Sequence, residues 1–233
     1  MALSRYFAGK DYEEYSFSDF NELFKEVAEK KLDYGIVPVE NTTTGIIART
    51  YDNFQYYDLH AVGEITVPVD QNLIVLPGTK IEDLKAVYSH PEALYQCRGF
   101  FRNNPHIKPV EYEDTAMSVQ YVKFRDDIHK GAIASKLAAQ QNGLEILQPK
   151  IQDNVHNMTR FLCISGTDEE VKDADMMSVM MVLPQKPGAL YKALGIFASK
   201  DINVLKVDSR PIFGKSSNTA SIWISMVIPR IPM

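Results

Sequence analysis

Four short polar segments carry the side chains in this sequence that could bind or convert a small molecule. They are residues 40–45, 89–94, 114–116 and 157–161, and each adjoins a run typical of a strand. Open α/β sheets bind ligands at strand ends, and the exposed N–H groups of helix N-termini attract anions. Hydroxyl and amide side chains at four such places together predict a cleft that suits a small polyanion.

The fourth segment has the most explicit chemistry. Thr159 supplies a hydroxyl, and the adjacent Arg160 supplies a guanidinium that can hold a carboxylate by a two-pronged contact. Taken singly, each segment has a plainer explanation. Ser89 or His90 caps a helix, residues 114 and 115 form another cap, and Thr159 with Arg160 is a strand residue beside a surface charge. Adjacency alone does not make Ser89 and His90 a nucleophile and its base.

Apolar spacing predicts the alternating elements that position these segments. In residues 17–29, for example, Phe20, Leu23, Phe24 and Val27 form one helical face. Further helices are expected at 91–102, 115–124, 136–141 and 189–199, with one beginning near residue 46. Strands are expected at 35–39, 65–67, 72–76, 84–88, 131–134, 160–164, 177–183 and 203–207. This alternation predicts an α/β catalytic region at 1–165, an acidic linker at 166–176 and a small second domain at 177–233.

Composition narrows the class of protein. The 233 residues carry a net charge of −5 without a basic stripe, which argues against nucleic acid and against an anionic membrane surface as partners. No apolar run approaches the roughly 20 residues that span a bilayer, and residues 1–10 do not read as a secretory signal. Cys97 and Cys163 lack the spacing of a zinc site, so we expect two buried thiols in a reducing cytoplasm.

The chain resembles the prephenate dehydratase family, in family order, over nearly the whole of its first 165 residues. Residues 38–45 resemble the family's P-x-E-N-S-x-x-G, and residues 89–97 resemble its S-H-P-Q-A-L-x-Q-C. The other matches are residues 114–116 to S/D-T-A, 132–135 in part to A-A-I-A-S, 151–153 to I-Q-D, and 157–161 to N-x-T-R-F.

The resemblance implies an activity and a fold. Members of the family are carbon–oxygen lyases that convert prephenate to phenylpyruvate in L-phenylalanine biosynthesis, losing carbon dioxide and water, without a metal or organic cofactor. Their catalytic region has two α/β lobes similar to periplasmic binding proteins. By this resemblance Thr159 is the proton donor to the leaving hydroxide, and Arg160 either holds a substrate carboxylate or is structural. The implied substrate-binding residues are Glu40, Asn41, Ser89, Gln96, Thr115 and Phe161, of which Phe161 packs rather than reacts.

The C-terminal part resembles an ACT regulatory domain, an α+β fold of the ferredoxin-like kind. The matching motifs are G-A-L at Gly188, Ala189 and Leu190, and E-S-R-P at Asp208, Ser209, Arg210 and Pro211. In the family these motifs bind phenylalanine as a feedback inhibitor, and the proteins form dimers or tetramers. The resemblance therefore implies an allosteric effector and a homodimer or homotetramer.

Three departures from the family leave an alternative open. The family's first strand and its G-P-x-G-S/T-Y/F-S loop are not found, so we expect residues 2–7 to lie in the helix that follows them. The ACT-like part shows no obvious second helix or final strand, and Glu92 and Asp208 replace the usual Gln and Glu. The alternative is a truncated, inactive relative that only binds a small anion or phenylalanine. An unrelated solute-binding protein is a more distant rival.

Overall fold

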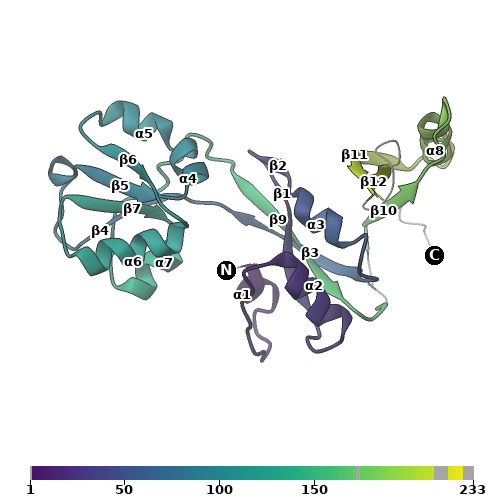
Figure 1. Cartoon of the computed structure of the whole chain (residues 1–233), viewed down its shortest axis with the longest axis horizontal. Coiled ribbons are helices and arrows are strands. Elements are labelled where there is room, and N and C mark those ends of the chain that lie inside the picture. Colours follow the sequence, from purple (N-terminus) through teal and green to yellow (C-terminus); the bar gives the residue numbers. More distant parts are fainter. Residues whose placement is uncertain (1, 170, 172–173, 213–219, 228–233) are drawn as a thin grey trace. The chain divides into compact units, whose positions relative to one another are not determined.

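A computed structural model of the chain describes residues 2–169, 171, 174–212 and 220–227, and only the backbone of 220–223 and 227. It divides into two compact units, each described by itself. Unit 1 comprises Met1–Tyr12, Glu40–Ile46 and Ile65–Phe161, and unit 2 comprises Glu13–Val39, Ile47–Glu64 and Leu162–Met233. The elements of both units are drawn in Figure 1.

The helices are α1 (Ala2–Tyr6), α2 (Phe20–Ala28), α3 (Ala48–Asn53), α4 (Pro91–Gln96), α5 (Arg98–Asn103), α6 (Thr115–Arg125), α7 (Lys136–Asn142) and α8 (Ala189–Ala198), with a 3-10 turn at Ile81–Asp83. The strands are β1 (Gly35–Asn41), β2 (Gly45–Ile46), β3 (His60–Pro68), β4 (Asn72–Val75), β5 (Ala86–Ser89), β6 (Lys108–Glu111), β7 (Lys130–Ala134), β8 (Glu145–Gln148), β9 (Met158–Ser165), β10 (Met176–Val182), β11 (Asn203–Pro211) and β12 (Ala220–Val227).

Unit 1 contains a five-stranded mixed sheet in the order β6-β5-β7-β4-β8. Strand β5 runs parallel to β6 and β7, whereas β4 is antiparallel to β7 and β8. Both faces are covered by helices, α4 and α5 on one and α6 and α7 on the other (Figure 1). Because both faces are buried, the central strands are continuously apolar rather than alternating.

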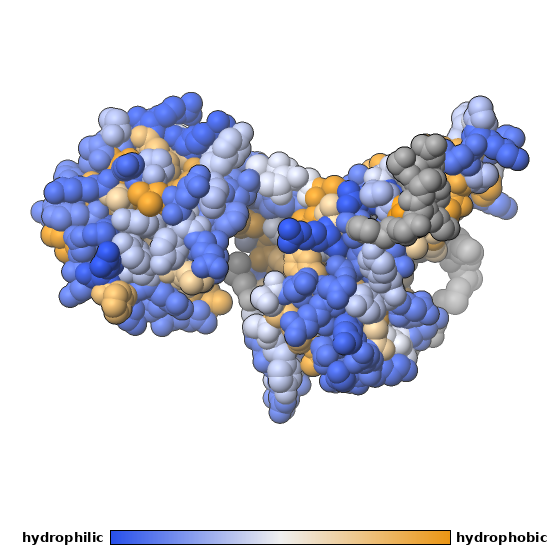
Figure 2. Space-filling model, in the orientation of Figure 1, coloured by the Kyte–Doolittle hydropathy of each residue, from blue (hydrophilic) through white to orange (hydrophobic). Residues whose placement is uncertain are grey.

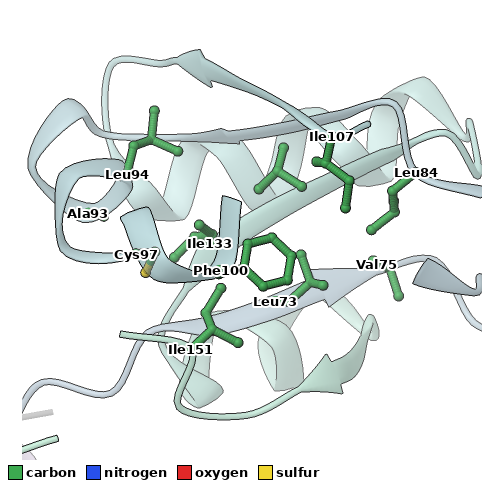
Figure 3. Packing of buried hydrophobic residues seen from close by; sticks show 11 residues of the cluster. Leu73, Val75, Leu84, Ala93, Leu94, Cys97, Phe100, Ile107, Ile133 and Ile151 are labelled. Carbon is green, nitrogen blue, oxygen red and sulfur yellow. The ribbon is translucent and has the colours of Figure 1, made fainter. Parts of the chain in front are cut away.

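The two cores follow directly from the two-residue period of strands. Leu73 and Val75 of β4 pack with Phe100 and Cys97 in one cluster (Figure 3), while Ile74, between them, packs against Val119 in the other. All of these residues are nearly or fully excluded from water. A slip of one residue in the register of β4 would move Leu73 and Val75 to the face that Ile74 now occupies. The large and small apolar side chains on the two faces therefore fix the register of the strand.

The second sheet, in the order β2-β1-β9-β3, includes strands that run through both units. In unit 2, Phe24 of α2 is fully buried and meets Phe54 edge-to-face with ring centroids 5.0 Å apart. Helix α3 is tied to β1 by two hydrogen bonds. Thr50 Oγ1 donates to the Pro38 carbonyl over 2.6 Å, and the Ile47 N–H donates to the Val39 carbonyl over 3.0 Å.

The third sheet, in unit 2, has the order β10-β12-β11, with all described pairings antiparallel. Helix α8 follows β10, and its N-cap residue is Gly188, whose φ of +79° lies in the left-handed region that glycine adopts without strain. This part of the chain has a strand, a helix and two further strands, and the third strand lies at the centre of the sheet. This order agrees with the α+β arrangement expected here.

Most predicted elements are confirmed, including the early helix at residues 2–7 and helix caps at Asp114 and Ser135. Two predictions were wrong. Residues 45–46 form strand β2, and the helix begins only at Ala48; the helix expected at 91–102 is two helices that meet at Cys97. Helix α2 is capped by Asp19, whose side chain accepts the Asn21 N–H.

The strands that sequence reasoning missed are mostly short edge strands. Strands β6 and β8 are the two edges of the five-stranded sheet and β2 is an edge of the second. Edge strands are exposed and tolerate residues such as Pro109, so they lack the apolar pattern that marks a buried strand. The domain boundaries at 165 and 176 stay a prediction, although β9 ends and β10 begins at those positions.

Among the residues that the structure describes, every helix falls short of the length and apolar character that crossing a bilayer requires.

Both cysteines are fully buried free thiols, as predicted. Burial among apolar side chains raises the pKa of Cys97 to about 12, and the Asp153 carboxylate adds to the rise. Since the thiolate is the reactive species, we expect neither native cysteine to react with a thiol reagent such as DTNB at pH 8, and both to react in guanidinium.

A Phe124→Cys variant is the matched control, because Phe124 is 85% exposed. It should release one equivalent of chromophore in the native state. Rapid reaction of the native wild-type chain would contradict the burial of its thiols.

Candidate active site

The end of β1 and the start of β9 bring the first and fourth polar segments together within unit 1. The two strands are neighbours in their sheet. The Thr42 N–H donates to the Met158 carbonyl over 2.9 Å, and the Met158 N–H donates to Thr42 Oγ1 over 2.9 Å. These two hydrogen bonds bring the neighbouring residues Asn41 and Thr159 close together.

The Asn41 amide is the centre of the cluster, and it is only 8% exposed. Its Oδ1 accepts the backbone N–H groups of Thr43 and Thr44 over 2.9 and 3.1 Å. Its Nδ2 donates to Asn157 Oδ1 over 2.7 Å and to Thr159 Oγ1 over 2.9 Å. Both amide protons and both lone pairs are therefore used within the protein.

The two backbone donors decide which end of the Asn41 amide is oxygen, because an N–H group can only face an acceptor. Nitrogen must then face Thr159, whose oxygen is an acceptor in this contact. A hydroxyl that accepts one hydrogen bond keeps its own proton for another partner. The geometry leaves the Thr159 proton available.

Further amides continue the cluster beyond Asn41. Asn157, 2% exposed, donates through Nδ2 to Gln96 Oε1 over 3.0 Å. Gln71 Nε2 donates to the same oxygen over 3.2 Å, and Gln96 Nε2 donates to Glu92 Oε1 over 3.2 Å. Gln96 thus lies in the same connected cluster as Asn41 and Thr159.

Glu40 and Arg160 form an ion pair beside Thr159, with Arg160 Nη2 at 3.5 Å from Glu40 Oε2. The Arg160 side chain is 16% exposed and that of Glu40 is 35% exposed. An unpaired carboxylate would repel an anionic ligand. The ion pair with Arg160 reduces that repulsion. Phe161 lies two residues after Thr159 on β9, half-buried on the same face of the strand.

Ser89 and Thr115 lie elsewhere in unit 1, on β5 and at the start of α6. Ser89 is fully buried, and its Oγ donates to the Ile133 carbonyl over 2.6 Å. His90 caps α4, since its Nδ1 accepts the Glu92 N–H over 3.2 Å. Thr115 is half-buried. Among the described residues, neither hydroxyl makes a hydrogen bond with the Thr159 cluster.

The residues of the two ACT-like motifs lie in unit 2, and one of them makes a two-pronged contact that the sequence did not predict. Arg210 donates from Nε to Asp52 Oδ1 over 2.9 Å and from Nη2 to Asp52 Oδ2 over 2.6 Å. Asp52 raises the pKa of Arg210, chiefly by this hydrogen bonding. Gln55 Nε2 donates to the Pro211 carbonyl over 3.2 Å. Asp208 and Ser209 precede Arg210 on β11, and residues 188–190 begin α8.

Two pockets lie away from Thr159. One, of about 480 Å³ in unit 2, is lined by α3, the segment after it and β10, and one of about 940 Å³ in unit 1 is lined by α4 and α5. Neither contains the amide cluster, so we assign the site from the geometry of its side chains. No group of three His, Cys, Asp or Glu side chains among the described residues is placed to hold a metal.

Sequence reasoning missed Asn157, Gln71, Glu92 and Asp52 as contributors. Asn157 belongs to the N-x-T-R-F run, so a role in the site could have been suspected. Gln71 and Asp52 give no local signal, because their partners lie 25 and 158 residues away.

Comparison with known proteins identifies the family. The family model for prephenate dehydratase matches residues 1–169. A bifunctional chorismate mutase/prephenate dehydratase of Aquifex aeolicus is 40% identical over 195 residues, which cover 83% of this chain and 53% of that enzyme. The chain spans about half the length of the first curated relatives that it matches.

Two solved structures share the fold over 97% of this chain. The prephenate dehydratase of Arthrobacter aurescens in complex with L-Phe superposes with a TM-score of 0.85 at 29% identity and is covered to 75%. A protein described as GqqA, a novel type of quorum quenching acylase, superposes with a TM-score of 0.83 at 27% identity and is covered to 81%. They confirm the predicted fold class of a dehydratase-like α/β catalytic region followed by an α+β part.

The match of the family model to residues 1–169 shows that the chain belongs to the prephenate dehydratase family.

Proposed function

We propose that this protein is a prephenate dehydratase that forms phenylpyruvate for phenylalanine biosynthesis. The observation that carries the proposal is the Thr159 hydroxyl, which accepts a hydrogen bond from Asn41 and keeps its proton free. A proton donor without a metal is what the reaction requires, because hydroxide is a poor leaving group.

The expected step is a concerted elimination. The bond from the ring to its carboxylate breaks and releases carbon dioxide, and its electron pair completes the aromatic ring as the ring hydroxyl departs. Thr159 donates its proton to that hydroxyl, so water leaves, and solvent later restores the proton. An alcohol is a weak acid, and the Asn41 N–H supports donation because it stabilises the negative charge that develops on Oγ1.

Arg160 is the proposed partner of a substrate carboxylate. A guanidinium is a planar fork of five N–H donors that matches the geometry of a carboxylate, and Arg160 lies next to Thr159 on β9. Glu40 then holds Arg160 in place rather than binding substrate. Asn41 similarly orients Thr159, since its hydrogen-bonding positions are used within the protein. Ser89, Gln96, Thr115 and Phe161 stay proposed contributors to substrate binding.

The acylase relative raises amide hydrolysis as a competing activity. An acyl-transfer enzyme needs a nucleophile activated by an adjacent base. Ser89 does not fit this role, because its proton is donated to the Ile133 carbonyl, and His90 caps a helix. These contacts support the dehydratase.

The proposed function predicts that the purified chain converts prephenate to phenylpyruvate, measured by the alkaline absorbance of the product. Thr159→Ala should lower kcat by about 100-fold or more, because it removes a proton donor. Thr167→Ala is the matched control, since this exposed hydroxyl lies outside the cluster and its loss should leave kcat unchanged.

A wild-type chain with intact circular dichroism and no product would exclude the enzyme and favour the alternative of a binding module. Full activity in Thr159→Ala would exclude Thr159 as the donor.

We also propose feedback regulation by L-phenylalanine through residues 188–190 and 208–211. The Arthrobacter relative was solved with L-Phe, and Arg210 joins the second segment to α3 through Asp52. Helix α3 is bonded in turn to β1, the strand that ends at Asn41. A change at Arg210 therefore has a connected route toward Thr159.

This route predicts that phenylalanine raises the melting temperature of the wild type and inhibits turnover. Asp52→Asn should retain the thermal shift but lose most of the inhibition, because a neutral amide pairs weakly with Arg210. Asp58→Asn, an exposed acid on the same segment, should be inhibited like the wild type.

No thermal shift in the wild type would count against phenylalanine as an effector. Unchanged inhibition in Asp52→Asn would show that coupling does not pass through this ion pair.

A homodimer is the proposed assembly, because the C-terminal strands and α8 expose large apolar side chains in the single chain. Leu205 is 53% exposed, Val182 54%, Ile196 64% and Tyr191 81%. Figure 2 shows hydrophobic surface gathered at these C-terminal strands. Burial of such side chains against a second copy would remove apolar area from water.

Sedimentation velocity at micromolar concentration should therefore give a species of at least two chains. Leu205→Lys should shift it toward monomer, whereas Phe124→Lys, at an exposed apolar position in unit 1, should not. A monomeric wild type would contradict the proposal.

A further inference from the structure

We infer that Asn157 is a positioning residue for Thr159, and that Asn157, Gln96 and Glu92 form a hydrogen-bond chain with one fixed direction. This inference rests on the proposed function for its catalytic meaning. All residues of this hydrogen-bond chain lie in unit 1. It consists of the contacts from Asn41 to Asn157, from Asn157 to Gln96 and from Gln96 to Glu92.

One end of the chain is fixed by donors that cannot reverse. The backbone N–H groups of Thr43 and Thr44 face Asn41 Oδ1, so the Asn41 nitrogen faces Asn157. The oxygen of Asn157 must then face Asn41, and its nitrogen must face Gln96. Each amide dictates the orientation of the next.

The other end is fixed by an acceptor that cannot donate. The Gln96 nitrogen donates to Glu92 Oε1 over 3.2 Å, and a carboxylate offers only acceptors to that nitrogen. Gln71 agrees with this orientation, because its Nε2 also donates to Gln96 Oε1, although its own amide can turn. The family motif that this chain resembles has Gln at position 92, and a Gln could either donate to Gln96 or accept from it. The Glu92 carboxylate can only accept.

The direction matters because it decides what Thr159 can do. With Asn41 as it stands, an N–H faces Thr159 Oγ1 and the hydroxyl proton is free. A reversed Asn41 would place its oxygen there, and Thr159 would donate to Asn41 instead of to the leaving group. Asn157 is 2% exposed, so it acts through Asn41 and not by contact with substrate.

Substitutions can reverse the donor-to-acceptor direction in part of this hydrogen-bond chain. Asn157→Asp keeps an acceptor for Asn41 but loses the donor to Gln96. Gln96 must then turn its nitrogen toward position 157, which points its oxygen at the Glu92 carboxylate. Glu92→Gln removes this conflict because it supplies a donor. Glu92→Ala removes the charge without supplying one.

The experiment compares Asn157→Asp with the double variants N157D/E92Q and N157D/E92A, which have equal net charge. We expect N157D to lower kcat about tenfold, since small displacements of reacting groups slow turnover steeply. We expect N157D/E92Q to recover at least threefold, and N157D/E92A to recover less, because alanine removes the carboxylate but supplies no donor. Because the two doubles carry the same charge toward the substrate, they should share one KM.

Melting temperature provides a readout that is independent of turnover. N157D should melt about 5 °C or more below wild type, since unmatched buried acceptors are destabilising and changes of this kind shift the midpoint by several degrees in a chain of this size. N157D/E92Q should regain part of that loss, and N157D/E92A should regain less of it. Equal recovery in both doubles would show that charge, not direction, governs the pair.

No recovery in either double, in melting temperature or in kcat, would overturn the directional chain. If the wild type forms no phenylpyruvate, the proposed function fails, and the melting temperatures alone still decide whether the chain has a fixed direction.

Discussion

The contacts of one side-chain amide, that of Asn41, determine the candidate site. Asn41 is the last residue of β1, and it joins the turn after that strand to the start of β9 through four hydrogen bonds. A buried amide that lost these partners would be costly to keep in place, so the fold holds its orientation firmly. Since that orientation leaves the Thr159 proton free, the chemistry of the site depends on the packing of an uncharged residue.

Two charge pairs complement this neutral cluster. Glu40 with Arg160 lies beside Thr159, and Asp52 with Arg210 joins β11 to α3. The four side chains are between 16% and 35% exposed, so the pairs are only partly screened by water. The first pair holds the guanidinium that we propose for substrate binding, and the second joins the proposed phenylalanine-binding motif to the helix that follows β1 and β2.

The protein shares its fold with relatives named for two different activities, so the fold alone does not fix the reaction. The distinguishing features are local. Ser89 donates to a backbone carbonyl and His90 caps a helix, which leaves no activated nucleophile there. By contrast, the Thr159 hydroxyl accepts a hydrogen bond from Asn41, and its own proton is available for donation. The assignment of a lyase therefore depends on the state of individual protons.

The sequence by itself determined the family, the central strands and helices, and the run of residues 157–161, because apolar periodicity and contiguous motifs are local properties of the chain. It also marked Thr159 and Arg160 as residues that could do chemistry. It did not reveal the edge strands β6 and β8, whose exposed residues carry no pattern. Only the tertiary structure decided that Asn41 orients Thr159, that Asn157 and Glu92 extend this contact, and that Asp52 pairs with Arg210. These contacts join residues up to 158 positions apart, and hydrogen-bond direction depends on partners that folding alone brings together.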